Sequence, residues 1–209
     1  MQKICVIVSG GDYYLPCGVA DGAFVIACDK GYGYCVKAGI VPDLTVGDFD
    51  SYCGEIPQAG EVKVLPCEKD DTDTMFAVKE ACARGYKDIR IYCAAGGRYD
   101  HFLANLQTAA YAAIRGAKVR LTGLYDDIYV FSSGEITLKK QKNRSLSVFA
   151  FSDKCEGVTI KGAKWELDGA ELVNGFPLGA SNEWCGDEDA VIGVKKGVLM
   201  VVSSLLIRE

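Results

Sequence analysis

The order of strand-like and helix-like segments is the feature that most restricts the fold of this chain. Up to residue 122, short apolar runs typical of buried strands alternate with segments typical of helices. Such alternation favours a mostly parallel sheet covered by helices, because each parallel connection needs a crossover segment. We expect strands at residues 4–9, 24–28, 44–46, 62–65, 88–93 and 118–122, and helices at 31–38, 74–84 and 102–115.

The pattern changes after residue 124, where helical periodicity stops. Two turn signals, Ser132-Ser133-Gly134 and Lys195-Lys196-Gly197, predict antiparallel hairpins. We therefore predict an α/β domain over residues 1–124 and a smaller all-β domain over residues 125–209. Strands of the second domain are expected at residues 128–132, 135–138, 146–150, 158–160, 190–194 and 198–204.

Charge and hydropathy exclude several kinds of partner. The net charge of -5 provides no basic field for nucleic acid or anionic lipid, so neither is an expected partner. No apolar stretch reaches the roughly 20 residues that span a bilayer, and we expect a soluble protein. The ten cysteines are scattered, many within apolar segments, and are expected to be reduced core residues of a cytoplasmic protein.

Aspartates recur where strands of the first domain are expected to end. Clustered carboxylates repel one another unless a cation compensates their charge, and Mg²⁺ is the hard cation that oxygen ligands suit best. Any single aspartate here is better explained as a helix cap or a turn residue, and only their shared location favours a metal site. The residues concerned are Asp29, Asp48, Asp50 and Asp100 after strands, and Asp70, Asp71 and Asp73 before a helix.

A glycine pair follows the apolar run at residues 88–93. In Gly96-Gly97-Arg98 the backbone N–H groups and the guanidinium could bind an anion, which predicts a phosphate cradle. Alternatively, the glycines only permit a tight turn and Arg98 pairs with a nearby aspartate. The sequence contains no P-loop and no complete dinucleotide fingerprint. His101 could contact a substrate or be structural.

Five motifs in one order carry a resemblance to a known family. Their types and spacing resemble the thiamine pyrophosphokinase family across nearly the whole chain. The resemblance implies an α/β nucleotide-binding domain followed by a β-sandwich that contributes to thiamine binding and to a homodimer. The motifs are Cys28-Asp29-Lys30-Gly31, the segment from Pro42 to Ser51, the segment from Glu68 to Asp73, the segment from Gly96 to His101, and Ser181-Asn182-Glu183.

The resemblance also implies a reaction: the terminal pyrophosphoryl group of ATP passes to the hydroxyl of thiamine, giving thiamine diphosphate and AMP. It implies that Mg²⁺ is held by Asp48, Asp50 and Asp73, with Asp70 and Asp100 as further catalytic residues. Expected contacts to ATP are Asp29, Lys69, Thr72, Gly97 and Arg98, and expected contacts to thiamine, across the dimer interface, are Ser181 and Asn182.

Some features remain open at this point. Lys30 stands where the family often has glycine, which adds a charge at the edge of the site. Trp165 and Trp184 could stack on a flat ring or pack in the core of the second domain.

Two other functions remain possible. Asp48-Phe49-Asp50 resembles the Asp-x-Asp motif of haloacid-dehalogenase-type phosphatases, although that motif normally ends the first strand of its domain. A non-enzymatic, acidic module that binds Ca²⁺ or a metabolite is the other possibility, and it lacks an EF-hand loop to support it.

Overall fold

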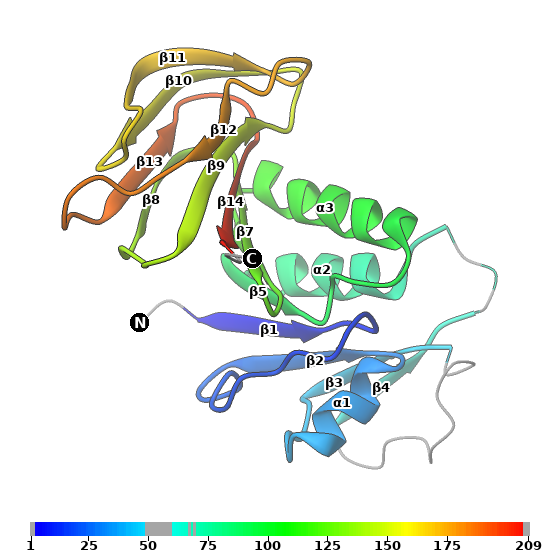
Figure 1. Ribbon diagram of the computed structural model, residues 1–209. Coiled ribbons are helices and arrows are strands. Elements are labelled where there is room, and N and C mark those ends of the chain that lie inside the picture. Colours follow the sequence, from blue (N-terminus) through cyan, green and yellow to red (C-terminus); the bar gives the residue numbers. More distant parts are fainter. Residues whose placement is uncertain (1–2, 49–59, 67, 69, 207–209) are drawn as a thin grey trace. The chain divides into compact units, whose positions relative to one another are not determined.

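The computed structural model of the chain describes residues 3–48, 60–66, 68 and 70–206. It divides into two compact units, Met1–Leu124 and Tyr125–Glu209 (Figure 1). The first unit contains β1 (Ile4–Val8), β2 (Phe24–Cys28), α1 (Gly31–Lys37), β3 (Leu44–Gly47), β4 (Glu61–Val64), α2 (Asp73–Ala83), β5 (Asp88–Tyr92), α3 (Tyr99–Ile114) and β6 (Lys118–Thr122).

The strands of the first unit form a parallel sheet in the order β6-β5-β1-β2-β3-β4. The chain builds outward from β1 to β4 and then returns to the other side of β1 with β5 and β6. The strand order therefore reverses at β1. In open α/β sheets, ligands bind at the carboxyl ends of the strands beside such a reversal.

Both faces of this sheet are covered, which explains why its strands read as continuous apolar runs. Val6, Val8 and Ala27 pack with Cys35 of α1 on one face. Because side chains alternate along a strand, Cys28 lies on the opposite face, where its thiol reaches the backbone of α2. The α/β class predicted for this half of the chain is confirmed.

The second unit is a β-sandwich. One antiparallel sheet has the order β12-β9-β14-β7 and the other β11-β10-β13-β8, and their inner faces share a single apolar cluster. The strands are β7 (Asp126–Phe131), β8 (Gly134–Leu138), β9 (Arg144–Ala150), β10 (Lys154–Lys161), β11 (Leu167–Val173), β12 (Gly179–Asn182), β13 (Ala190–Val194) and β14 (Leu199–Leu205).

The two predicted hairpins are wrong. β7 pairs with β14 while β8 pairs with β13, so the turn at Ser132-Ser133-Gly134 carries the chain from one sheet to the other. The turn at Lys195-Lys196-Gly197 likewise joins β13 and β14, which lie in different sheets. Phe131, Leu138, Val194 and Leu199 on either side of these turns enter the same core from opposite sheets, and this burial decides the pairing.

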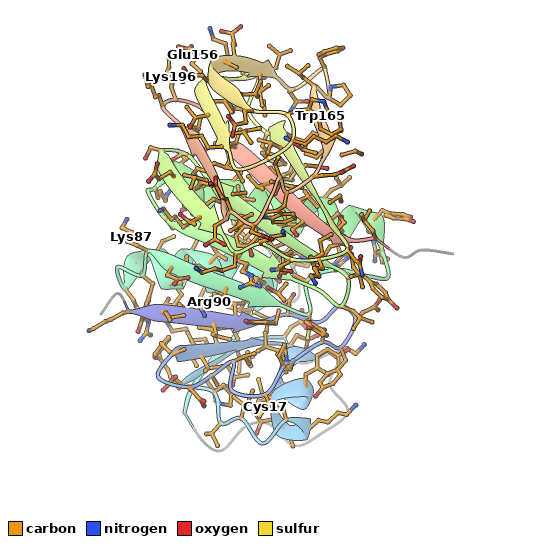
Figure 2. All side chains as sticks on the ribbon, turned by 60° about the vertical axis from the view of Figure 1, so that its left-hand side comes forward. Cys17, Lys87, Arg90, Glu156, Trp165 and Lys196 are labelled. Atoms are coloured by element: carbon orange, nitrogen blue, oxygen red, sulfur yellow. The ribbon has the colours of Figure 1, made fainter. Side chains whose placement is uncertain are left out.

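The cysteines correspond only in part to the expectation. Every cysteine that the structure describes is free, and Cys5, Cys28, Cys35, Cys93 and Cys155 are buried. Cys17 and Cys185 are exposed, so they are not core residues (Figure 2 labels Cys17). Over the described part of the chain, no helix has the length and apolar character needed to cross a membrane.

Candidate active site

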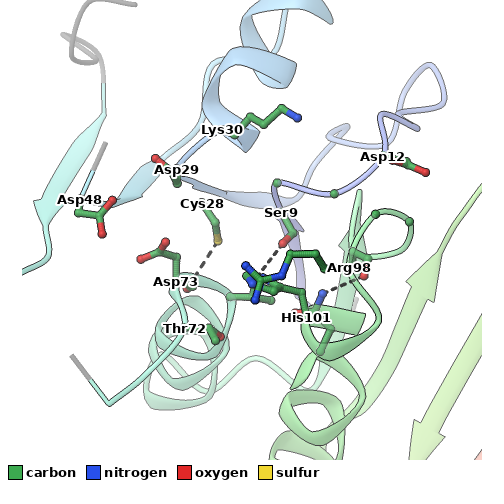
Figure 3. Close-up of a pocket in the computed structure, with 17 residues that line it drawn as sticks. Ser9, Asp12, Cys28, Asp29, Lys30, Asp48, Thr72, Asp73, Arg98 and His101 are labelled. Atoms are coloured by element: carbon green, nitrogen blue, oxygen red, sulfur yellow. Dashed lines mark hydrogen bonds between the residues drawn. The ribbon is translucent and has the colours of Figure 1, made fainter. Parts of the chain in front are cut away.

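A cavity of about 490 Å³ lies in the first unit, at the carboxyl ends of β1, β2, β3 and β5 and the first turns of α2 and α3 (Figure 3). Its position at the strand reversal is the one expected for a ligand site in this class of sheet. The described residues that line it are Ser9, Gly10, Gly11, Asp12, Cys28, Asp29, Lys30, Asp48, Thr72, Asp73, Thr74, Ala94, Gly96, Gly97, Arg98, His101 and Asn105.

Aspartates from separate elements meet in this cavity. Asp29 follows β2, Asp48 follows β3 and Asp73 is the first residue of α2, and Figure 3 shows them on the same side of the pocket. The strand ends are held together because the Asp29 N–H donates to Val46 O at 2.8 Å. Asp29 itself adopts φ 44°, in the left-handed region that Asp tolerates better than most residues.

Part of the predicted metal site can be located. Asp48 and Asp73 line the pocket, whereas Asp50 lies outside the described residues, as does Lys69. Within the described ranges, no three His, Cys, Asp or Glu side chains are grouped closely enough to hold a metal ion between them. Mg²⁺ commonly uses only one or two protein carboxylates and completes its shell with water and substrate phosphates. The donors present are therefore chemically suited to Mg²⁺ bound together with a polyphosphate.

The glycine pair after β5 contributes to the pocket wall. Gly96 and Gly97 have φ values of +86° and +68°, which most side chains disfavour. A Cβ on Gly96 would also overlap the carboxylate of Asp12, whereas Gly97 has open space around it. The backbone at this turn thus reaches the cavity without a side chain in the way.

Arg98 pairs with Asp100, as the alternative interpretation of this motif proposed. Its Nε and Nη2 donate to the two carboxylate oxygens at 3.1 and 2.5 Å, and the N–H of His101 donates to the same carboxylate at 2.9 Å. The hydrogen bonds from Arg98 are the main reason that the pKa of Asp100 falls to about 2. Arg98 and His101 line the pocket, whereas Asp100, which accepts hydrogen bonds from both, is not among the described lining residues.

The segment before α2 differs in detail from expectation. Thr72, and not Asp73, caps the helix, because its hydroxyl accepts a hydrogen bond from Met75 N at 3.1 Å. Asp71 pairs with Lys79 at 2.6 Å. Asp70 is exposed and is not among the residues described as lining the pocket.

Several pocket residues were not singled out from the sequence as site residues. Ser9 and Thr74 are buried, and their hydroxyls are hydrogen-bonded at 2.7 Å between the end of β1 and the first turn of α2. Asn105 of α3 donates from Nδ2 to Ala94 O at 2.8 Å. In the sequence, this wall of the pocket corresponds to Ser9-Gly10-Gly11-Asp12, directly after the first apolar run. These four residues resemble an ordinary turn and were therefore not distinctive.

Cys28 also lines the pocket, but its chemistry is inert. Burial is the largest cause of a strongly raised pKa for this thiol, and the neighbouring Asp73 adds to it. The thiol donates weakly to Asp73 O at 3.7 Å. It therefore remains protonated and helps to hold the start of α2, instead of acting as a nucleophile.

Ser181 and Asn182 belong to the second unit, on β12. Ser181 is exposed, with φ 59°, whereas only 3% of Asn182 is exposed. The Asn182 amide accepts from Trp165 N at 3.1 Å and donates to Trp165 O at 2.7 Å. Asn182 thus fixes the backbone beneath Trp165, whose side chain is 54% exposed (Figure 2). Trp184 is half-buried against the sandwich core.

The fold and the pocket define an α/β unit of the enzyme type, with an acidic, glycine-walled pocket at the strand reversal, followed by a β-sandwich. Residues 19–121 match the family description "Thiamin pyrophosphokinase, catalytic domain", and residues 134–199 match "Thiamin pyrophosphokinase, vitamin B1 binding domain". The chain belongs to the thiamine pyrophosphokinase family. The resemblance inferred from its motifs is confirmed.

Individual relatives agree with this assignment. The chain is 30% identical over 213 residues to thiamine pyrophosphokinase from Bacillus subtilis, with 98% of this chain and 99% of the relative covered. The crystal structure of thiamine pyrophosphokinase from Bacillus subtilis superposes with a TM-score of 0.85 at 30% identity, covering 98% of this chain and 100% of the other. For the Geobacillus thermodenitrificans enzyme the TM-score is 0.79 at 27% identity, with 96% and 97% covered.

Proposed function

We propose that the pocket of the first unit binds ATP with Mg²⁺ and that the chain transfers the pyrophosphoryl group of ATP to the hydroxyl of thiamine. The products are thiamine diphosphate and AMP. Family membership over both units supports the reaction type. The observation that carries the assignment to this pocket is the convergence of Asp29, Asp48 and Asp73 with the Gly97-Arg98 turn at the strand reversal.

In this reaction the thiamine oxygen attacks the β-phosphorus of ATP. A bond forms between that oxygen and Pβ, the bond between Pβ and the oxygen bridging to Pα breaks, and AMP leaves with the bridging oxygen. The hydroxyl proton passes to a base or to solvent. Transfer of this kind requires alignment of donor and acceptor and neutralisation of the charge on phosphate oxygens.

Different groups of the pocket are proposed to align the substrates and to neutralise the phosphate charge. Asp48 and Asp73, with Asp50, are proposed to hold Mg²⁺, which when bound would neutralise charge on the polyphosphate oxygens. The backbone at Gly97 and the guanidinium of Arg98 are proposed to contact phosphate oxygens. Because Asp100 engages both Nε and Nη2 of Arg98, we assign it to orienting that guanidinium.

Further contacts to ATP are proposed for Asp29, Lys69 and Thr72, with Asp70 as a further catalytic residue. The Thr72 hydroxyl already caps α2, so a contact from this residue would also depend on the position of that helix.

The acceptor site is proposed to involve the second unit, contributed across a homodimer. Residues 134–199 match a vitamin B1 binding domain, and this range includes Ser181 and Asn182. The exposed hydroxyl of Ser181 is suited to contact thiamine directly, whereas the buried Asn182 would act by fixing the backbone at Trp165. We also propose a cytoplasmic location, because the free state of all the cysteines described fits a reducing compartment.

The experiment that tests this proposal is an incubation of the full chain with thiamine, ATP and Mg²⁺, followed by chromatographic separation of nucleotides and thiamine phosphates. Formation of thiamine diphosphate with an equal amount of AMP is the expected result. Thiamine monophosphate with ADP would show γ-phosphoryl transfer instead. Phosphate release that does not depend on thiamine, or no turnover, would contradict the proposal.

A further inference from the structure

The wall of the pocket beside α1 carries a positive charge, the amine of Lys30, to which the proposed reaction assigns no role. Lys30 directly precedes α1, is exposed and lines the pocket. Its Cβ lies 3.5 Å from where a Cβ on Gly10 would stand, so its stem runs next to the segment that follows β1. Figure 3 shows the side chain extending along the edge of the pocket.

Tyr34 holds this lysine in position. The Lys30 Nζ lies 5.4 Å from the centroid of the Tyr34 ring, and the Tyr34 hydroxyl donates to Gly11 O at 2.8 Å. A hydrogen bond to Tyr34 is the main reason that the pKa of the Lys30 amine is raised, and the nearby Asp12 adds to the effect. The amine is therefore charged at neutral pH and is linked through one side chain to the pocket wall.

That wall is itself rigidly placed. The Gly11 N–H donates to Cys93 O at 2.7 Å, beyond the end of β5. A Cβ on Gly11 would lie 2.5 Å from Ala95 O and 2.7 Å from Cys93 O, which shows how closely the two backbones approach. Lys30 is thus positioned relative to the end of the sheet, where the proposed nucleotide site lies.

The charge balance of the pocket gives this lysine a role. Arg98 already shares its guanidinium with Asp100. A bound polyphosphate brings several more negative charges into the site, and a lysine is well suited to bind phosphate oxygens as a point charge. Among the described residues that line the pocket, the carboxylates are Asp12, Asp29, Asp48 and Asp73, and the permanent cations are Lys30 and Arg98.

We propose that Lys30 binds the polyphosphate of the nucleotide and sets the preference of the pocket for a triphosphate, with Tyr34 as the residue that positions it. The inference rests on the proposed function, which supplies a nucleoside triphosphate as the donor.

Lys30→Met tests this contact, and Lys37→Met is its matched control. Lys37 is the last residue of α1, with its Nζ 4.2 Å from the Tyr13 ring, and it is not among the described lining residues. Binding of α,β-methylene ATP with Mg²⁺, and of adenosine, would be measured by titration calorimetry. We expect Lys30→Met to weaken binding of the triphosphate about tenfold, or about 1.4 kcal/mol, as for one charge-assisted hydrogen bond. The affinity of Lys30→Met for adenosine should change by less than about twofold. The affinities of Lys37→Met for the triphosphate and for adenosine should also change by less than about twofold.

Two more variants separate contact from structure. Lys30→Arg should retain most of the triphosphate affinity, because it keeps the charge, and Tyr34→Phe should lose part of it while adenosine binding is unchanged. Equal losses for triphosphate and adenosine, or an unchanged triphosphate affinity in folded Lys30→Met and Lys30→Gln, would overturn the inference. A wild-type chain that binds the triphosphate through Lys30 but makes no thiamine diphosphate would refute the proposed function alone.

Discussion

The hydroxyl pair Ser9–Thr74 allows a quantitative test of how the pocket is assembled. The two oxygens are 2.7 Å apart, and only 6% of Ser9 and 5% of Thr74 is exposed, so water cannot easily replace either partner. Ser9→Ala or Thr74→Val alone leaves the other hydroxyl buried without this bond, which costs about 1–3 kcal/mol of unfolding free energy. The double variant replaces both partners by apolar groups and should cost about 0–1 kcal/mol, much less than the sum of the single variants.

The assay is urea unfolding followed by far-ultraviolet circular dichroism. All helices that the structure describes lie in the first unit, so this signal reports on the part of the chain that carries the substitutions. Val41→Thr is the control, because it exchanges a methyl and a hydroxyl group at a residue of the same unit that is 71% exposed, and it should change stability by less than about 0.5 kcal/mol. Strict additivity of the two single changes would refute the inferred bond between β1 and α2.

Further predictions concern the turns and the ion pair beside the pocket. Thr72→Ala removes the cap of α2 and should lower the urea midpoint by the equivalent of about 1 kcal/mol. Gly96→Ala should both destabilise the fold and impair nucleotide binding, because its Cβ would overlap the carboxylate of Asp12. Gly97→Ala has open space around the new Cβ and should cost only about 1 kcal/mol of backbone strain. Equal losses of nucleotide affinity in the two variants would contradict this difference. Arg98→Met should return the pKa of Asp100 from about 2 toward 3.8, measured by carboxyl NMR titration. Because the folded-state pKa of Asp100 is depressed, the stabilisation from this pair is present above pH 3.8 and is lost as the pH falls through about 2. If the pKa of Asp100 in Arg98→Met stayed at its wild-type value, Arg98 would not be the cause of the depression.

The sequence predicted the first unit well because its signals there are local. Apolar runs of the parallel sheet and the crossover helices each carry their own periodicity. The start of α3 was placed three residues late, at 102 instead of Tyr99, because the first turn of this helix is exposed and shows no apolar pattern.

The second unit was predicted less completely, for two reasons. β11 and β12 were missed: in β11 only Leu172 is buried, and β12 consists of Gly179-Ala180-Ser181-Asn182, so neither has strand-like alternation. The hairpins failed because turn residues report local geometry, whereas the pairing of β7 and β8 with other strands depends on burial in a shared core.

For the candidate site, strand ends were the useful signal. Asp29, Asp48 and Asp73 were singled out from sequence, and all line the pocket. Ser9 and Asn105 were not, because a buried serine after a strand and an asparagine within a helix have no distinctive pattern. Their partners become visible only when β1, α2 and α3 are brought together in space.

The pocket carboxylates are assigned to binding the metal and the polyphosphate, and the variant Asp73→Asn tests this assignment. Asp71→Asn is a control two residues away, since Asp71 pairs with Lys79 at the surface and is not among the described lining residues. The measurement is the rate of Mg²⁺-dependent thiamine diphosphate formation in both folded variants. We expect a loss of about two orders of magnitude or more for Asp73→Asn and a rate close to wild type for Asp71→Asn. A folded Asp73→Asn variant with near-normal turnover would contradict this assignment.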